Sequence, residues 1–208
     1  MSRTKNFDEM KVLHKILLLF RQKGYHQASL EDILRSGGIS KQSMYDTYGD
    51  KRQVFLKAFR LYREESVKAL FDLVQEELNK EVSAIDILRN MIFPGKTPDE
   101  TVKGCLMINT MIELKEKDDE ISIEINKLLL SLAEIIRLLV KRGQMNGEIT
   151  DRLPVDHITE VLLNTRNGIQ VNQHYEMPLD MMHNIANWTI DLIRVKNRKF
   201  PAPSISPA

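Results

Sequence analysis

Apolar residues recur every three or four positions along most of the chain, which is the spacing of one face of an α-helix. In the first such segment Leu13, Ile16, Leu17 and Phe20 fall at positions i, i+3, i+4 and i+7, and basic residues occupy the rest of the turn. No segment in which apolar and polar residues alternate is long enough to predict a β-strand, and the sequence has no internal repeat. The pattern therefore predicts an all-α chain.

Capping residues and glycines divide this pattern into separate helices. Ser29 and Ser40 are of the type that caps helix N-termini, whereas Gly24 and the pair at 37 and 38 are typical of helix ends. After the segment that Gly24 ends, we expect helices over residues 29–37, 41–48, 51–79, 83–93, 100–116, 118–144, 155–171 and 179–196. Prolines and small residues in the tail, 200–208, predict disorder.

Residues 29–51 carry the most informative arrangement: two short capped helices joined by a tight turn that contains glycine. Glycine accepts the positive φ that lets the second helix cross the first steeply, as in a helix-turn-helix. The second helix of this motif enters the major groove of DNA. Residues suited to base edges are Gln42, Ser43, Asp46 and Thr47, and those suited to phosphates are Lys41, Tyr45, Tyr48 and Lys51. The spacing alone also fits a plain helical hairpin in which both tyrosines are packing residues.

Charge is distributed unevenly along the chain. The formal net charge is only +1, but residues 1–63 hold 13 Lys and Arg against 6 Asp and Glu, which gives +7 and leaves −6 for the rest. A basic segment joined to an acidic body indicates an anionic partner, with nucleic acid the leading candidate. Basic surfaces are also common without any partner, so the charge supports the motif and does not replace it.

The first quarter of the chain resembles the N-terminal signature of the TetR-type transcriptional regulators. The resemblance rests on a Leu-Phe pair, Gly-Tyr, a Ser cap, an Ile-Ser-Lys turn, a Tyr pair and a Lys that opens the next helix. These positions are Leu19, Phe20, Gly24, Tyr25, Ser29, Ile33, Gly38, Ile39, Ser40, Lys41, Tyr45, Tyr48 and Lys51. So many residues at fixed spacing make the resemblance specific.

The resemblance implies a DNA-binding head over 1–63 and a helical regulatory and dimerisation body over 64–199. It implies a homodimer formed by the last two long helices, a double-stranded operator, and a small-molecule inducer in the body that releases the operator, with repression as the family's habit. It places Ser29, Lys41, Tyr45, Tyr48 and Lys51 at positions that usually touch the DNA backbone, and Gln42 and Ser43 at positions that often read bases. Ser40, the cap of the second helix, is also expected among the DNA-binding residues.

Two departures from the family pattern concern base recognition. Relatives often carry small residues where this chain has Gln42, and an aromatic residue or His where it has Asp46 and Thr47. A glutamine amide pairs bidentately with adenine, and a carboxylate accepts from a cytosine amino group. The sequence therefore predicts an operator preference of its own.

The body offers weaker signals. Its methionines are either an adaptable pocket lining or ordinary core residues, and nearby amides could bind a ligand's polar groups. The methionines are Met91, Met107, Met111, Met181 and Met182, and the amides are Asn109, Asn164, Asn167 and Gln170.

Cys105 lies in a Gly-Cys-Leu segment found in one branch of the same regulators. By resemblance, its thiol is a candidate sensor of electrophiles or oxidants, which would require access and a lowered pKa. A buried structural cysteine is the alternative.

The last two predicted helices carry more apolar surface than one neighbour can cover. This surface predicts either a two-fold helix bundle between two copies, with a palindromic operator, or an internal core.

Other classes of protein lack support. The five histidines form no zinc motif with glutamate, and no nucleophile elbow, phosphate loop or dinucleotide fingerprint occurs, so we expect no enzyme, metal or cofactor. A helical protein-binding adaptor would leave Lys41, Tyr45 and Lys51 without a role. A single cysteine and the absence of a long apolar run predict a cytoplasmic protein without membrane spans.

Overall fold

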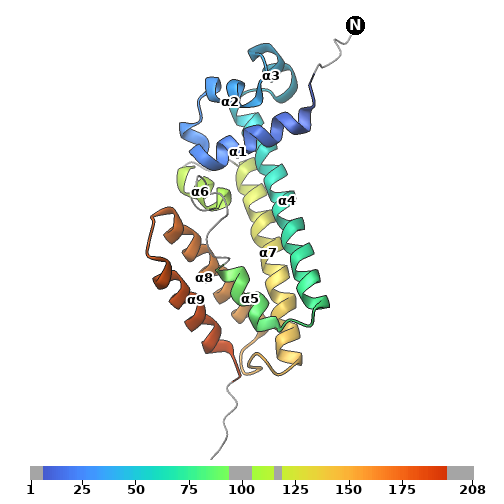
Figure 1. The fold of residues 1–208 in the computed structure, drawn as a ribbon, viewed down its shortest axis with the longest axis vertical. Coiled ribbons are helices and arrows are strands. Elements are labelled where there is room, and N and C mark those ends of the chain that lie inside the picture. The colour runs from blue at the N-terminus through green and yellow to red at the C-terminus, as the bar shows by residue number, and fades with distance from the viewer. Residues whose placement is uncertain (1–6, 94–104, 115–118, 196–208) are drawn as a thin grey trace, which may run out of the picture.

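The computed structural model describes residues 7–93, 105–114 and 119–195. Within these residues the regular structure is helical, which confirms the all-α prediction, and the chain forms an elongated stack of helices (Figure 1). The helices are α1 (Glu9–Gln27), α2 (Leu30–Gly37), α3 (Lys41–Tyr48), α4 (Lys51–Asn79), α5 (Ala84–Ile92), α6 (Leu106–Glu113), α7 (Asp119–Met145), α8 (Val155–His174) and α9 (Leu179–Ile193).

Side-chain caps start the helices of the head, as their sequence predicts. Asp8, Ser29, Ser40 and Asp50 each accept a hydrogen bond from a backbone N–H in the first turn of the helix that follows. Ser29 also forms a full capping box with Asp32. Gly38 has φ +66° and closes α2 in the left-handed conformation, which favours glycine at the turn into α3.

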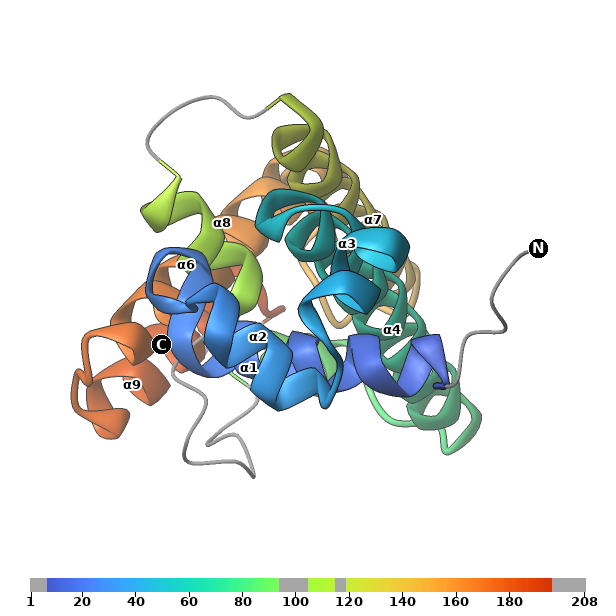
Figure 2. The ribbon, with the colours of Figure 1, turned by 90° about the horizontal axis from the view of Figure 1, so that it is seen from above.

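α1 is broken near its end. Gly24 has φ 76° and ψ 179°, so the helical path stops there and one further short segment leads to Gln27. The sequence prediction that Gly24 ends this helix is therefore right about the break, although the segment beyond it is still helical. α1 lies across the upper ends of α4 and α7, and α2 and α3 pack above it (Figures 1 and 2).

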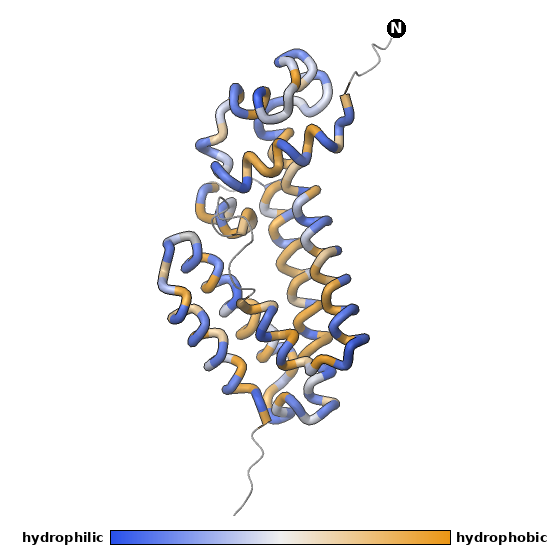
Figure 3. Tube along the Cα trace, in the orientation of Figure 1, coloured by the Kyte–Doolittle hydropathy of each residue, from blue (hydrophilic) through white to orange (hydrophobic). Residues whose placement is uncertain are grey.

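Two apolar clusters form the interior. The first joins α1, α2 and α3 to the upper part of α4, to α6 and to the first half of α7, around the fully buried rings of Phe20, Phe55 and Phe59. The second joins the lower part of α4 to α5, α8, α9 and the rest of α7. Leu70 and Leu163 pack against both clusters. Figure 3 shows the apolar faces of α4 and α7 running from one cluster to the other. The head thus shares its core with the body.

A buried carboxylate also ties the head to the body. Glu124 of α7 is 3% exposed and lies 3.2 Å from Arg60 Nε, 3.0 Å from Arg63 Nε and 3.0 Å from Lys127 Nζ. Burial alone would raise the pKa of Glu124, but hydrogen bonds from Lys127 and Arg60 and the nearby charge of Arg63 hold it below its usual value. This cluster fixes α4, which leaves the head, against the first turns of α7.

Several helix boundaries differ from the predicted ones. Cys105 has extended backbone and no side-chain cap bond, so α6 begins at Leu106 and not before Cys105. α8 continues to His174, and α9 stops at Ile193 because Arg194 turns into a bridge with Ile149. The predicted disordered tail, 200–208, lies outside the described residues.

The methionines of the body divide into two groups. Met91, Met107 and Met182 are buried in the clusters, whereas Met111 and Met181 are about half exposed. The exposed pair therefore does not line an interior. No helix among the described residues is long and apolar enough to cross a membrane.

Candidate nucleic-acid interface

α3 presents a polar face outward from the end of the molecule. Lys41, Gln42, Tyr45 and Asp46 are exposed, whereas Met44 is fully buried beneath them. This division follows from the helical repeat, since positions 41, 42, 45 and 46 share one side of the turn. Figure 2 shows α3 and α2 uncovered by the helices of the body.

Ser40 and Ser29 serve mainly as caps. The Oγ atom of Ser40 accepts from the Ser43 N–H at 3.1 Å and donates to Ser43 Oγ at 2.9 Å. Ser29 Oγ accepts from the Asp32 N–H at 3.0 Å and donates to the Asp32 carboxylate at 2.9 Å. Both hydroxyl protons are therefore used inside the head, and what these serines contribute is the angle at which α2 and α3 begin.

Asp32 anchors α2 to α1. Its carboxylate lies 2.9 Å from Lys23 Nζ and 2.5 Å from Arg35 Nη2. The hydrogen bond from Lys23, together with those from Ser29, lowers the pKa of Asp32. The helix that precedes α3 is thus held by a charge that stays ionised at neutral pH.

Gln42 and Asp46 are joined to each other. Gln42 Nε2 donates to Asp46 Oδ1 at 2.7 Å, one helical turn away. This bond fixes the orientation of the Gln42 amide. The amide Oε1, its second N–H and the second carboxylate oxygen of Asp46 remain available for hydrogen bonds to DNA bases. The sequence predicts two independent base-reading residues, but the structure shows a coupled pair.

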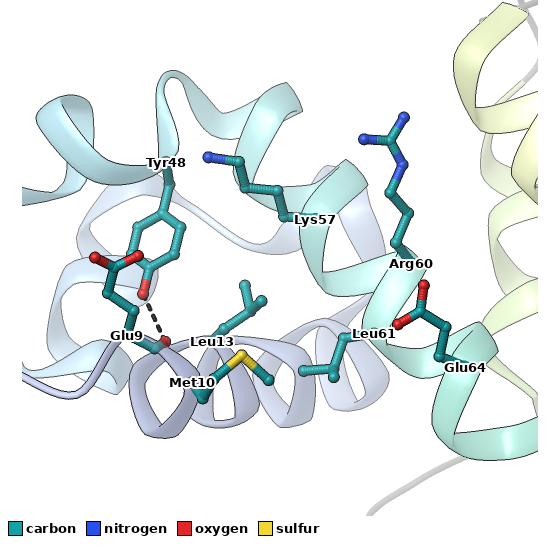
Figure 4. Close-up of a pocket in the computed structure, with 8 residues that line it drawn as sticks. All are labelled: Glu9, Met10, Leu13, Tyr48, Lys57, Arg60, Leu61 and Glu64. Carbon is teal, nitrogen blue, oxygen red and sulfur yellow. Dashed lines mark hydrogen bonds between the residues drawn. The ribbon is translucent and has the colours of Figure 1, made fainter. Parts of the chain in front are cut away.

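The two tyrosines of α3 lie in different environments. Tyr45 is 45% exposed, as a phosphate-contacting phenol requires. Tyr48 is 4% exposed, and its hydroxyl donates to the Glu9 carbonyl at 2.8 Å (Figure 4). Burial and the acidic Glu9 and Asp8 raise the pKa of Tyr48 to about 12. The expectation that Tyr48 reaches phosphate does not fit this position, because the helical repeat turns it toward α1.

Two lysines of α4 border α3. Lys51 Nζ lies 4.7 Å above the ring of Tyr25 and 3.4 Å from the His26 carbonyl, and partial burial lowers its pKa. Lys57 Nζ donates to the Thr47 carbonyl at 2.8 Å, where a cation complements the negative end of α3. Sequence reasoning missed Lys57, although a lysine two turns into the following helix is within reach of this helix end.

A surface cleft of about 300 Å³ lies beside this lysine, between α1 and α4 (Figure 4). Met10, Leu13 and Leu61 form its apolar part, and Lys57 and Arg60 extend from α4 on one side. Both cations are already paired, Lys57 with α3 and Arg60 with Glu124 of α7. The cleft therefore marks the seam between α1, α3 and α4.

α6 holds the other end of α1. The Glu113 carboxylate accepts from the His26 N–H at 2.9 Å, and the Glu113 carbonyl lies 3.0 Å from His26 Nε2. A Cβ on Gly24 would come within 1.9 Å of Glu113 Oε1, so the glycine makes this approach possible. A helix of the body is thus fastened directly to the head, just before α2.

Cys105 lies at the opposite end of α6. Its thiol is half-buried and lies 3.0 Å from the Tyr62 hydroxyl. Among the described residues no group of three or more His, Cys, Asp and Glu side chains could hold a metal ion.

The sequence of this chain matches the models of known protein families. Residues 12–58 match the model of bacterial regulatory proteins of the tetR family, and residues 63–177 match the C-terminal region of YsiA-like proteins. The Bacillus subtilis HTH-type transcriptional regulator YezE is 34% identical over 155 residues, which are 73% of this chain and 79% of YezE.

Two solved structures share the fold. The TetR family transcriptional regulator CifR, a cysteine mutant complexed with a 26-base-pair operator, has a TM-score of 0.72 and 18% identity, over 92% of this chain and 100% of the CifR chain. FadR from Bacillus subtilis, in complex with stearoyl-CoA, has a TM-score of 0.66 and 19% identity, over 89% of this chain and 97% of FadR. With its capped helix-turn-helix and with both family models matched, this chain belongs to the tetR family of DNA-binding transcriptional regulators.

Proposed function

We propose that the protein is a ligand-responsive repressor that binds a two-fold operator as a homodimer. The observation that carries this proposal is the exposed face of α3, whose polar residues point away from a rigidly capped head. Occupying an operator blocks access to the promoter beneath it. A ligand in the body would release the operator by changing the position of the heads, and the FadR complex with stearoyl-CoA supports ligand binding in this fold.

The DNA contacts divide into two groups. We assign base recognition to Gln42, Ser43, Asp46 and Thr47, because they lie at or near the exposed face of α3. We assign phosphate contacts to Lys41 and Tyr45, which are exposed on that face, and to Lys51 at the start of α4, whose ammonium also contacts the Tyr25 ring and the His26 carbonyl. Ser29 and Ser40 position these residues through their caps. Tyr48 is left out, since its hydroxyl serves the interior.

The dimer surface is proposed on α8 and α9. Met181, Trp188 and Leu192 follow one exposed side of α9, with Trp188 67% and Leu192 80% exposed, and Val161 of α8 is 52% exposed. The opposite side of α9 is buried in the second cluster. A contiguous apolar face of this kind is typical of an interface between subunits. Sedimentation of the wild type and of a W188E/L192E variant tests it: we expect a dimer and a monomer, and a monomeric wild type would contradict the proposal.

Salt dependence tests the phosphate contacts. The wild type should bind DNA from its own upstream region with an affinity that falls steeply with salt, because counterions are released. Replacing Lys41 by alanine removes one phosphate contact from each subunit of the proposed dimer, so it should lower the slope of log affinity against log salt by about 2. The matched control is Lys68→Ala, since Lys68 is exposed on the body and pairs with Asp72. Equal slopes for the wild type and both variants would contradict the assignment.

The Gln42–Asp46 pair predicts a non-additive result. Asp46→Ala frees the Gln42 amide to turn, so preference at the base pair that Gln42 reads should relax although Gln42 is unchanged. At operators varied only at the base pair that Gln42 reads, discrimination should therefore be similar in the Gln42→Ala protein and in the double variant, with about 1–3 kcal/mol lost in each. Losses that simply add would mean that the two residues act independently.

A second candidate function is thiol sensing by Cys105. The Tyr62 hydroxyl at 3.0 Å and the position of the thiol at the start of α6 favour it, because α6 ends on the head. N-ethylmaleimide should then release the operator from the wild type and not from Cys105→Ser. Failure of native protein to react with the maleimide, with full reaction after unfolding, would exclude this function.

A further inference from the structure

A polar site lies where the two apolar clusters meet. Tyr62 of α4 and Cys105 pack against the first cluster, while Leu162 and Ile169 of α8 belong to the second. Arg166 lies between these two α8 residues and close enough to Tyr62 to act on its charge. Burial and Cys105 nevertheless raise the pKa of the Tyr62 phenol, so it remains a neutral hydrogen-bonding group.

Arg166 differs from the paired arginines of the molecule. Arg60 and Arg63 both face Glu124, whereas among the described residues no carboxylate pairs with Arg166. Its Nη1 atom is sealed from solvent and has no hydrogen-bond partner there, and the Oδ1 atom of the adjacent Asn167 is in the same state. The residue as a whole is half-buried, and a guanidinium stays protonated in either environment, so Arg166 is a permanent positive charge with one sealed donor and no carboxylate beside it among the described residues.

The sealed Nη1 donor of Arg166 makes the ligand-free protein less stable. An unpartnered buried donor loses its hydrogen bonds to water and gains none in return, and the loss is larger for a charged group. An incoming anion would supply the missing acceptor. Gln170, one turn further along α8 and 6% exposed, adds an amide on the same side of the helix.

We propose that the body binds an amphipathic molecule with a single anionic group, such as a carboxylate, which pairs with Arg166. Its apolar part lies among the side chains that join the two clusters, including Leu70 and Leu163. The Tyr62 hydroxyl and the Gln170 amide complete the hydrogen bonds to the anion. This inference rests on the proposed function, since it names the ligand class of the same regulatory body.

The sealed position of Arg166 explains how such a ligand acts on the head. Because Nη1 is closed off, an anion that binds it must displace neighbouring groups, and α6 is among the helices that pack against α8. α6 in turn holds His26 through Glu113 at its far end. Figure 1 shows α6 between α8 and the head. Ligand binding therefore displaces the helix that fastens the head to the body.

The test compares decanoate with decanamide, which has the same chain without the charge. Full-length wild type, Arg166→Gln and the control Arg152→Gln, which changes an exposed arginine in the loop before α8, are examined by thermal unfolding and by operator anisotropy. Decanoate should raise the unfolding midpoint and release the operator in the wild type and in Arg152→Gln. Its affinity should fall at least about tenfold in Arg166→Gln, and decanamide should act weakly on all three.

Any of the following results would overturn the proposal. One is an Arg166→Gln protein with a clearly lower midpoint without ligand, since that would make Arg166 a structural residue. Another is an equal effect of decanoate on Arg166→Gln and the wild type, or of decanamide and decanoate. The third is no effect of decanoate on the wild type. Operator binding without any probe is measured in the same assay, so failure of DNA binding itself would be recognised separately.

Discussion

Replacing Glu124 by glutamine should lower the free energy of unfolding by about 3 kcal/mol. The side chain is 3% exposed and has Arg60, Arg63 and Lys127 within 3.2 Å. Glutamine keeps the shape but removes the charge, so three cations are left close together beside a neutral amide. Removing one partner of a buried ion cluster costs far more than removing one of an exposed pair, because the remaining charges lose their compensation.

Glu134→Gln is the matched control. Glu134 lies on the same helix and pairs with Arg137, but its side chain is 64% exposed, so its loss should cost less than about 1 kcal/mol. Urea unfolding at pH 7 measures both, and in thermal unfolding the Glu124 variant should melt roughly 6–12 °C lower. Equal costs for the two variants would refute the view that Glu124 holds the head against α7.

The pH dependence of the Glu124 variant has a definite sign. The pKa of Glu124 is held below its usual 4.5, so the carboxylate contributes stability above that pH and loses it as the pH falls through the lowered value. The difference between wild type and Glu124→Gln should therefore be full at pH 7 and shrink in acid. A difference that stayed constant to pH 2 would assign the loss to packing rather than to charge.

Three further predictions concern the head. Gly24→Ala should cost more than about 1 kcal/mol, because of its positive φ and the 1.9 Å approach of Glu113 Oε1, and adding Glu113→Ala should recover part of the loss in urea unfolding. His14 donates hydrogen bonds to the Met10 carbonyl and to Glu65, and these bonds raise the pKa of His14. Below pH 6.5, His14→Gln should therefore lose at most about 1 kcal/mol of stability relative to the wild type, and this difference should fade as the pH rises past the raised pKa. A loss that does not change with pH would contradict the ion pair between His14 and Glu65. Tyr48→Phe should lose about 1 kcal/mol of stability but keep the operator affinity of the wild type at one fixed salt concentration, and a clearly weaker affinity would restore Tyr48 as a phosphate contact.

The sequence predicts the helices well because its signals are local. Ser29, Ser40 and Gly38 act through the backbone of neighbouring residues, so their caps and the turn between α2 and α3 appear as expected. The start of α6 is less predictable, since Cys105 supplies no side-chain cap and the apolar pattern continues on both sides. Where α9 ends depends on a bridge to Ile149, which lies far away in the sequence.

The site is predictable only as far as the helical repeat reaches. The helical repeat brings Lys41, Gln42 and Tyr45 to the exposed face of α3 and turns Tyr48 toward the interior. The resemblance to relatives instead implies that Tyr48 contacts phosphate. The Glu124 cluster and the contact between Glu113 and His26 join residues more than 60 positions apart. No pattern along the chain indicates them, because each depends on how the helices pack.

The chain contains one tryptophan, and it lies on the exposed side of α9. Trp188 is 67% exposed in the single subunit, so its indole is surrounded largely by water. Association of two subunits through this face would transfer the ring to an apolar environment and shift its fluorescence to shorter wavelength. If the proposed dimer forms through this face, the chain contains its own optical reporter of assembly, which would follow the subunit equilibrium during dilution without any label, because the chain has no other tryptophan.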